Sequence, residues 1–351
     1  MDVTASQLIN MYAIKYHRLK ELSSVVFPNL KQPEQIHIYI DLNKILARLY
    51  SNPTCHLSKD LILGSDIINL AGHYRGFFKS YVNLPCKVHL IFGSYVPRYN
   101  LNVYPEYNSR KITKIINDDY TKNIITDNLD IVETISKYLN NLYYHTTRYE
   151  SGVVIYDIKN RYPNDLHIII TGDHYNYQLV DDNCIIFRPL KVNKNGQRED
   201  LSYIITKDNN IQTYCIEKKY KIENNEQIKL GLNGGLYSLF LAYNGAPCRD
   251  ISSMRNRASV ILKNLHQLVK SNTLLNTHNN LLDTDDIFVN SDMSDLYNRY
   301  CAIDIPTQYE NYKHSADIDK IDFNDYTDPE TVEQINNNYY NDFPILLDNF
   351  M

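Results

Sequence analysis

Two largely apolar stretches that each run into an aspartate constrain the fold of this chain most strongly. IHIYID covers residues 36–41 and ends at Asp41, and LHIIITGD covers residues 166–173 and ends at Asp173. Such continuous runs are typical of parallel strands that are buried on both faces. In open α/β sheets the chemistry lies just beyond the carboxyl ends of these strands. We therefore expect Asp41 and Asp173 at one edge of a parallel sheet.

Strands and helices are expected to alternate along the chain, which predicts an α/β fold with a mainly parallel central sheet flanked by helices. Further strands are expected at 87–92, 184–190 and 201–206, and helices at 5–30, 64–81, 127–145, 226–243 and 251–270. Periodicity fades after about residue 275. The expected organisation is a helical lead-in (1–35), an α/β domain (36–274) and an acidic, partly ordered C-terminal arm (275–351).

Composition is that of a globular protein, with 43% hydrophobic residues. We see neither a signal peptide nor an apolar run of membrane-spanning length, so we expect an intracellular, cytoplasmic protein, or a virion component if it is viral. The viral interpretation comes from the 31 tyrosines and absent tryptophan, a bias typical of AT-rich genomes. Six scattered cysteines argue for reduced thiols, against a zinc site and against a disulfide framework.

Charge is distributed unevenly along the chain. Residues 283–351 contain 16 acids and three bases, a net charge of −13, whereas residues 1–282 contain 33 bases and 25 acids, a net charge of +8. A basic body favours a polyanionic ligand such as nucleic acid. The arm is interpreted either as a contact for a protein partner or as a solvated extension that keeps the protein soluble.

Two carboxylates at neighbouring strand ends repel each other unless a cation lies between them. A hard divalent ion, Mg²⁺ or Mn²⁺, suits carboxylate oxygens. Nucleases use such ions to activate water and to stabilise the oxygens of the phosphodiester. The pattern around Asp41 and Asp173 therefore predicts a divalent-cation site of the kind that such nucleases need; if the protein is active, it is a divalent-metal-dependent phosphodiesterase.

The sequence resembles the flap-endonuclease/PIN-like 5′ nucleases over residues 36–265. IYIDLNKILARLY resembles their first acidic motif, and residues 150–180 match without a gap a helix that begins with an acid, a strand, S-G-D-x-D and Q-L-V. LFLAYNGAPCRDI (239–251) resembles the segment with the last acid. The resemblance implies a helix at 150–162 and a PIN-like fold. It also implies catalytic roles for Asp41, Glu150, Asp173 and Asp250, with Asp41, Glu150 and Asp173 as metal ligands.

The departures from the family pattern indicate a degraded acidic site. Gly93, Gly152, Val153 and Tyr175 stand where the family has acids, and the Gly-rich turn after the last acid is not recognisable. The remaining acids suffice for one metal site. Each also has a plainer interpretation, because a strand-end aspartate often caps a helix and a glutamate at a helix start is favoured by the helix dipole. The eleven histidines show no spacing typical of metal ligands.

Four bases lie where the family has the arch that clamps a nucleic-acid strand: Arg98, Arg110, Lys111 and Lys114. A solvated loop with scattered bases explains them equally well. The leading hypothesis is a catalytically degraded, flap-endonuclease-like protein retained for nucleic-acid binding or as an assembly component. One alternative is an active Mg²⁺-dependent 5′ nuclease in which Glu150 holds a metal-bound water, and another is a purely structural protein.

Overall fold

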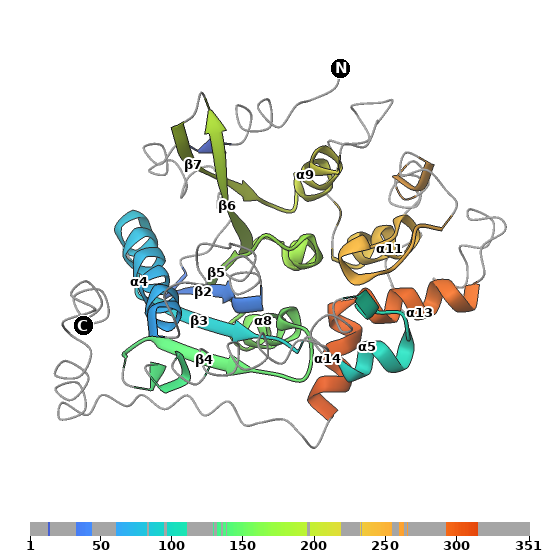
Figure 1. Ribbon diagram of the computed structural model, residues 1–351, viewed down its shortest axis with the longest axis horizontal. Coiled ribbons are helices and arrows are strands. Elements are labelled where there is room, and N and C mark those ends of the chain that lie inside the picture. Colours follow the sequence, from blue (N-terminus) through green and yellow to red (C-terminus); the bar gives the residue numbers. More distant parts are fainter. Residues whose placement is uncertain are drawn as a thin grey trace.

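A central β-sheet organises the molecule (Figure 1). The structure is a computed structural model. It describes residues 13–14, 33–43, 61–82, 84–94, 97–110, 129, 132–134, 136–137, 139–194, 197–218, 232, 234–254, 260–262, 265 and 293–314. Within these residues, none of the helices has the length and apolar character needed to cross a membrane.

Seven strands of the described chain form one sheet in the order β1-β7-β6-β5-β2-β3-β4. The five from β4 to β6 run parallel, whereas β7 and β1 are antiparallel to their neighbours. The predicted mainly parallel sheet is therefore confirmed. The strands are β1 (Ala13–Ile14), β2 (Ile36–Asp41), β3 (Cys86–Phe92), β4 (Leu142–Thr146), β5 (Leu166–Ile170), β6 (Cys184–Lys194) and β7 (Gln197–Ile205).

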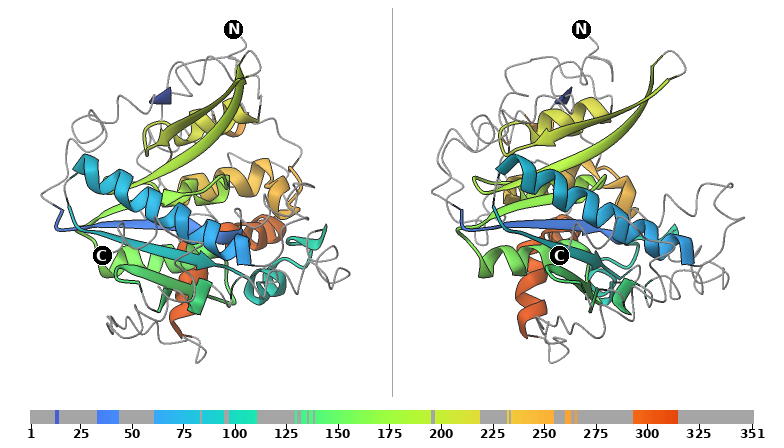
Figure 2. Two further views of the ribbon diagram at one scale, coloured as in Figure 1. Left: turned by 60° about the vertical axis from the view of Figure 1, so that its left-hand side comes forward. Right: turned by 90° about the vertical axis from the view of Figure 1, so that its left-hand side faces the viewer.

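Helices cover both faces of the sheet (Figure 2). One face packs against α4 (Leu61–Val82). The core on the opposite face includes α8 (Ser151–Arg161), η3 (His174–Leu179), α9 (Asn210–Glu217), α11 (Gly234–Asn244), α13 (Met293–Ile303) and α14 (Ile305–His314). Two short helices are α5 (Arg98–Val103) and η4 (Pro247–Arg249).

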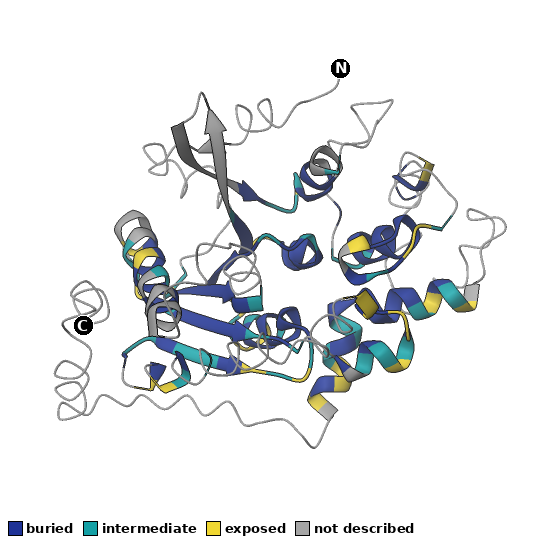
Figure 3. Ribbon diagram, viewed as in Figure 1, coloured by how far each residue is buried: buried dark blue, intermediate teal, exposed yellow. Residues whose placement is uncertain are grey.

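The alternation of side chains along β2 determines on which face of the sheet Asp41 lies. Ile38 and Ile40 belong to the apolar cluster with α4, whereas Tyr39 belongs to the cluster with α8. Because successive side chains of a strand point to opposite faces, Asp41 shares the α8 face with Tyr39. Figure 3 shows that β2, β5 and most of α8 are buried, as expected for the centre of an α/β sheet.

Residues 142–146 form strand β4, not the end of the helix expected at 127–145. Asn141 has a left-handed backbone with φ of 62°. Asparagine tolerates this conformation better than most residues, so the Asn140-Asn141 pair ends one element and the β-favouring LYYHT begins another. Ala13–Ile14, expected within a helix, pairs with β7 as a strand; the rest of 5–30 lies outside the described residues.

Residues 293–314 were expected to belong to a C-terminal arm that starts at residue 275. In the structure they form α13 and α14, which pack onto the core. Leu296, Tyr300 and Ile303 are buried at helical spacing. The surrounding Asn, Asp and Tyr residues obscured this apolar stripe in the sequence, because tyrosine can supply core volume as well as surface polarity.

A row of buried histidines crosses three neighbouring strands on the α8 face. His145 Nε2 lies 3.0 Å from His89 Nδ1, His89 Nε2 lies 3.0 Å from His37 Nδ1, and His37 Nε2 lies 3.0 Å from Asp165 Oδ2. Because a carboxylate can only accept, all three imidazoles in this row donate through Nε2, while His89 and His37 accept through Nδ1. Burial lowers the pKa of His89 well below its usual value and the pKa of His145 to about 3.

This row makes the protein sensitive to acid. In the unfolded chain a histidine takes up a proton near pH 6.5, whereas His89 and His145 stay neutral in the fold. The stability they contribute is complete above pH 6.5 and falls as pH drops toward 3, by about 1 kcal/mol per pH unit for each neutral histidine. Urea unfolding between pH 7.5 and 4.5 measures this slope.

His145→Gln keeps an N–H that can donate to His89 but cannot titrate. We expect this variant to lose stability less steeply with falling pH than the wild type. His73, which is exposed on α4, supplies the matched control, and His73→Gln should keep the wild-type slope. Equal slopes for His145→Gln and the wild type would contradict this account.

Candidate functional site

Asp41 and Asp173 lie at the same edge of the sheet, where the sequence placed them. Asp41 is the last residue of β2, and Asp173 follows the parallel strand β5 by three residues. Thr171 links them, because its hydroxyl donates to Asp41 Oδ2 at 3.1 Å and accepts from the Asp173 amide at 3.0 Å. Both carboxylates are buried.

Asp173 also has the plainer role of a helix cap. Its Oδ1 accepts a hydrogen bond from the Tyr175 amide at 3.2 Å, at the start of η3. Its Oδ2 accepts from the guanidinium of Arg249 instead. One carboxylate therefore ends a strand, begins a 3₁₀ helix and joins the candidate site.

Glu150, immediately before α8, is buried and bonded to the segment after α5. Its Oε1 accepts from the Tyr107 hydroxyl at 2.8 Å and lies 3.4 Å from Asn108 Nδ2. Burial and the nearby Glu150 carboxylate raise the pKa of Tyr107 well above its usual value. Tyr107 therefore stays protonated and donates to Glu150.

Arg249, which the sequence analysis did not single out, joins these carboxylates. Its Nη2 donates to Asp173 Oδ2 at 2.8 Å and to Glu150 Oε2 at 3.1 Å. Its Nε lies 3.0 Å from Glu150 Oε1 and 3.0 Å from the Tyr107 hydroxyl oxygen. The guanidinium is buried, so this is a desolvated ion cluster. We refer to Tyr107, Glu150, Asp173 and Arg249 as the Arg249 cluster.

Tyr175 supports the guanidinium from one side. The Arg249 Cζ atom lies 4.7 Å from the centre of the Tyr175 ring, a favourable cation–π distance. Gln308 on α14 donates to the Tyr175 hydroxyl at 2.6 Å. The sequence resemblance led us to expect an acid at this position; the structure has here a tyrosine ring that contacts the cation.

Gly93 and Gly152, two further positions at which the resemblance predicts an acid, are closed by packing. A Cβ atom at Gly93 would lie 2.3 Å from the backbone nitrogen of Ser151. A Cβ atom at Gly152 would lie 2.6 Å from Ile305 Cδ1, at the start of α14. Real Cβ atoms do not approach other atoms so closely. A side chain at Gly93 would therefore require the backbone at the start of α8 to move, and one at Gly152 would require the Ile305 and Asn176 side chains to move.

Asp250, which the resemblance predicted as the last acid of the site, pairs with Arg110, whereas its neighbour Arg249 pairs with Glu150 and Asp173. The Asp250 backbone is left-handed with φ of 58°, and its carboxylate accepts from the backbone amide and the guanidinium of Arg110. The Arg110 side chain is 76% exposed, whereas that of Asp250 is only 10% exposed, so the guanidinium of this pair reaches solvent and the carboxylate is largely covered. The segment predicted to bring an acid to the site thus brings a base.

The bases predicted to bind nucleic acid are only partly among the described residues. Arg98 begins α5, while Lys111 and Lys114 lie outside the described residues. Arg110 is exposed and lies close to the Arg249 cluster. Asn108, two residues earlier, contacts Glu150 through its side chain, and its backbone N–H donates to the Arg249 carbonyl at 2.9 Å. Arg148 is also exposed, two residues before Glu150. Bases therefore remain at the surface above the buried cluster.

A divalent metal does not fit this arrangement. Among the described residues, no group of three or more His, Cys, Asp or Glu side chains is placed to hold a metal ion. The guanidinium of Arg249 bonds to the oxygens of Glu150 and Asp173 that such an ion would need. Adding a dication beside the buried arginine would bring like charges together at low dielectric.

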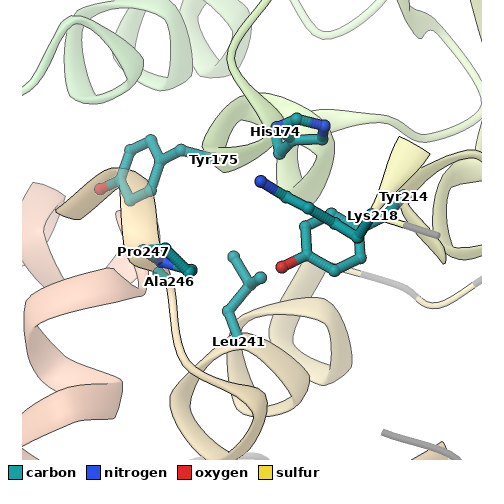
Figure 4. A pocket seen from close by; sticks show the side chains of 7 residues that line it. All are labelled: His174, Tyr175, Tyr214, Lys218, Leu241, Ala246 and Pro247. Carbon is teal, nitrogen blue, oxygen red and sulfur yellow. The ribbon is translucent and has the colours of Figure 1, made fainter. Parts of the chain in front are cut away.

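The cavity next to the cluster is too small for a nucleotide. Its volume is about 10 Å³, room for about one water molecule, and it is lined by His174, Tyr175, Tyr214, Lys218, Leu241, Ala246 and Pro247. Figure 4 shows the Lys218 amine reaching toward His174 and Tyr175. A larger groove of about 500 Å³ includes Asp181, Asp182 and Lys207, near the start of β6 and beyond the end of β7. It is therefore separate from the carboxyl edge where Asp41 lies.

Comparison with known proteins finds no matching family model and no matching curated protein. Solved structures similar to this chain include a pseudo-enzyme–product complex of bacteriophage T5 flap endonuclease with DNA and metal ions, at 13% identity and a TM-score of 0.49 over 82% of this chain and 95% of that chain. Zinc-bound T5 5′-exonuclease is similar at 13% identity and a TM-score of 0.45, over 79% and 92%. Human GEN1 with Holliday junction DNA is similar at 12% identity and a TM-score of 0.41, over 83% and 65%. Similarity at this level assigns neither an activity nor a ligand to this chain.

Two arginines that each pair with carboxylates allow a matched test of the cluster. Arg249→Met should lower the free energy of unfolding by about 3–5 kcal/mol, because it leaves buried carboxylates without a counter-ion. Arg110→Ala removes a mostly exposed guanidinium from its pair with Asp250 and should cost only about 1 kcal/mol. Urea unfolding at pH 7.5 measures both. A similar small decrease for the two variants would contradict the buried ion cluster.

Proposed function

We propose that this protein is a catalytically degraded, flap-endonuclease-like protein that binds nucleic acid without cleaving it. The observation that carries the proposal is the guanidinium of Arg249 between Glu150 and Asp173. In a metal-dependent nuclease, acids of this kind must hold a cation that is free to bind water and phosphate oxygens. A guanidinium that is bonded to both carboxylates is not free to bind either the water or the phosphate oxygens.

Three of the positions at which the resemblance predicts an acid support the same proposal. Tyr175 contacts the arginine, Gly152 faces Ile305, and Gly93 lies against the backbone of Ser151. These substitutions fit the arginine-filled arrangement and also oppose a return to an acidic one. Removing a single charge-stabilising group from an active site commonly costs orders of magnitude in rate. We expect the combined changes to abolish hydrolysis.

Nucleic-acid binding rests on local charge more than on the net charge of the body. Because α13 and α14 belong to the core, the acidic segment beyond them is residues 315–351, with nine acids and one base. Residues 1–314 then contain 35 bases and 32 acids, an excess of only +3. Exposed bases at the carboxyl edge, above all Arg110, are therefore the proposed contacts with phosphates, together with Arg98, Lys111 and Lys114.

We expect the full-length protein to bind labelled flap, nicked or single-stranded DNA, or single-stranded RNA, and to leave it intact in Mg²⁺. Binding should weaken steeply with added salt, because each neutralised phosphate releases counterions. Gel-shift titrations at several salt concentrations measure the affinity, and denaturing gels of the same samples measure cleavage.

Charge reversal identifies the binding surface. Arg110→Glu/Lys111→Glu should weaken binding to all sequences alike and reduce the salt slope by about one for each phosphate that the protein no longer neutralises. Lys79→Glu/Lys137→Glu reverses two exposed bases near the amino ends of β3 and β4 and should leave binding unchanged. Cleavage that disappears in Asp41→Ala and Asp173→Ala would establish an active nuclease instead. Absence of salt-sensitive binding to any of these nucleic acids would favour a structural protein.

A further inference from the structure

We propose that Arg249 is a built-in counter-ion that replaces a divalent metal, so that the carboxyl edge is assembled and competent to bind without any metal. The inference deepens the proposed function by specifying what holds the site together. It predicts that chelators affect neither the stability of the protein nor its affinity for nucleic acid. The position of a single nitrogen atom carries the proposal.

Arg249 Nη2 contacts one oxygen of each carboxylate, at 2.8 Å from Asp173 and 3.1 Å from Glu150. The two oxygens are therefore at most about 6 Å apart, the sum of these distances. Ca²⁺ binds carboxylate oxygens at roughly 2.3–2.6 Å, so it spans about 5 Å between opposite ligands. The nitrogen thus lies where a hard cation could reach both carboxylates after a small inward movement of the side chains.

The backbone around Arg249 aims its side chain at this point. Ala246 and Ile251 form an antiparallel bridge, so the chain turns back on itself through η4. The turn requires positive φ at Gly245, 83°, and at Asp250, 58°. The Asn108 amide then holds the Arg249 carbonyl at 2.9 Å. The guanidinium is therefore held in place by backbone geometry as well as by its ion pairs.

The balance of charge explains why a single arginine is enough to stabilise the two buried carboxylates. Glu150 and Asp173 carry two negative charges, of which the guanidinium offsets one, while hydrogen bonds from Tyr107, Asn108 and the Tyr175 amide stabilise the rest. Without the guanidinium, both carboxylates would remain buried beside Tyr107 and would lack this counter-ion. Such a pair recruits a cation from solution when space for it exists.

The test is to remove the side chain and to measure what the carboxylates bind. Arg249→Ala should gain a Mn²⁺ site with a dissociation constant on the order of 0.1–1 mM, typical of weak carboxylate sites. The wild type should bind Mn²⁺ at least tenfold more weakly. Electron paramagnetic resonance of free Mn²⁺ measures binding directly, at constant ionic strength. Thermal unfolding in EDTA and in Mn²⁺ should show a saturable rise in Tm for the variant and none for the wild type.

Two further variants keep the test decisive. Arg249→Gln keeps an amide donor in the cluster and should fold where Arg249→Ala is too unstable, again with Mn²⁺ binding above the wild-type level. Adding Asp173→Asn to either variant should abolish the new site. Wild-type binding of Mn²⁺ that disappears in Asp173→Asn would overturn the proposal, as would equal binding by the wild type and both Arg249 variants.

The failure of this inference can be distinguished from failure of the proposed function. Cleavage of nucleic acid by the wild type would overturn the proposed function, whatever Arg249 variants bind. If the wild type binds nucleic acid without cleavage but loses its affinity in EDTA, the proposed function stands and the built-in counter-ion is wrong. We expect the same affinity in EDTA and in Mg²⁺ of matched ionic strength.

Discussion

A buried guanidinium between two carboxylates is the interaction on which the carboxyl edge of this sheet depends. Arg249, Glu150 and Asp173 come from three separate segments, and each is buried. Buried charges cost several kcal/mol of desolvation each, so the cluster is stable only while every member keeps its partners. It therefore ties η4, α8 and the end of β5 together more strictly than an apolar contact would.

The C-terminal helices belong to the same arrangement. Gln308 on α14 bonds the Tyr175 hydroxyl, and Ile305 fills the space at Gly152. Gln178 in η3 accepts from the Ile305 amide at 2.9 Å and donates to the Ile303 carbonyl at 3.2 Å. Packing by α14 and ion pairing by Arg249 thus complement each other.

The sequence predicted the elements whose signal is local. The runs that end at Asp41 and Asp173 indicated buried parallel strands, and the match over 150–180 indicated helix α8 where VVIYDI alone suggests a strand. The Arg249 cluster was not predicted, because its members are distant in the sequence: Arg249 lies 99 residues from Glu150 and 76 from Asp173. A base beside the expected acid Asp250, together with Tyr175 at an acid position, was the available signal. The histidine row was missed for the same reason, since cross-strand register alone brings its members together.

The central claim is that a guanidinium, and not a metal ion, lies between Glu150 and Asp173. A crystal structure of the wild-type protein grown in Mn²⁺, with anomalous data collected at the manganese edge, tests it most directly. The account predicts continuous density for Arg249 in contact with both carboxylates and no anomalous peak between them. An anomalous peak bridging Glu150 and Asp173, with the Arg249 side chain displaced, would contradict it.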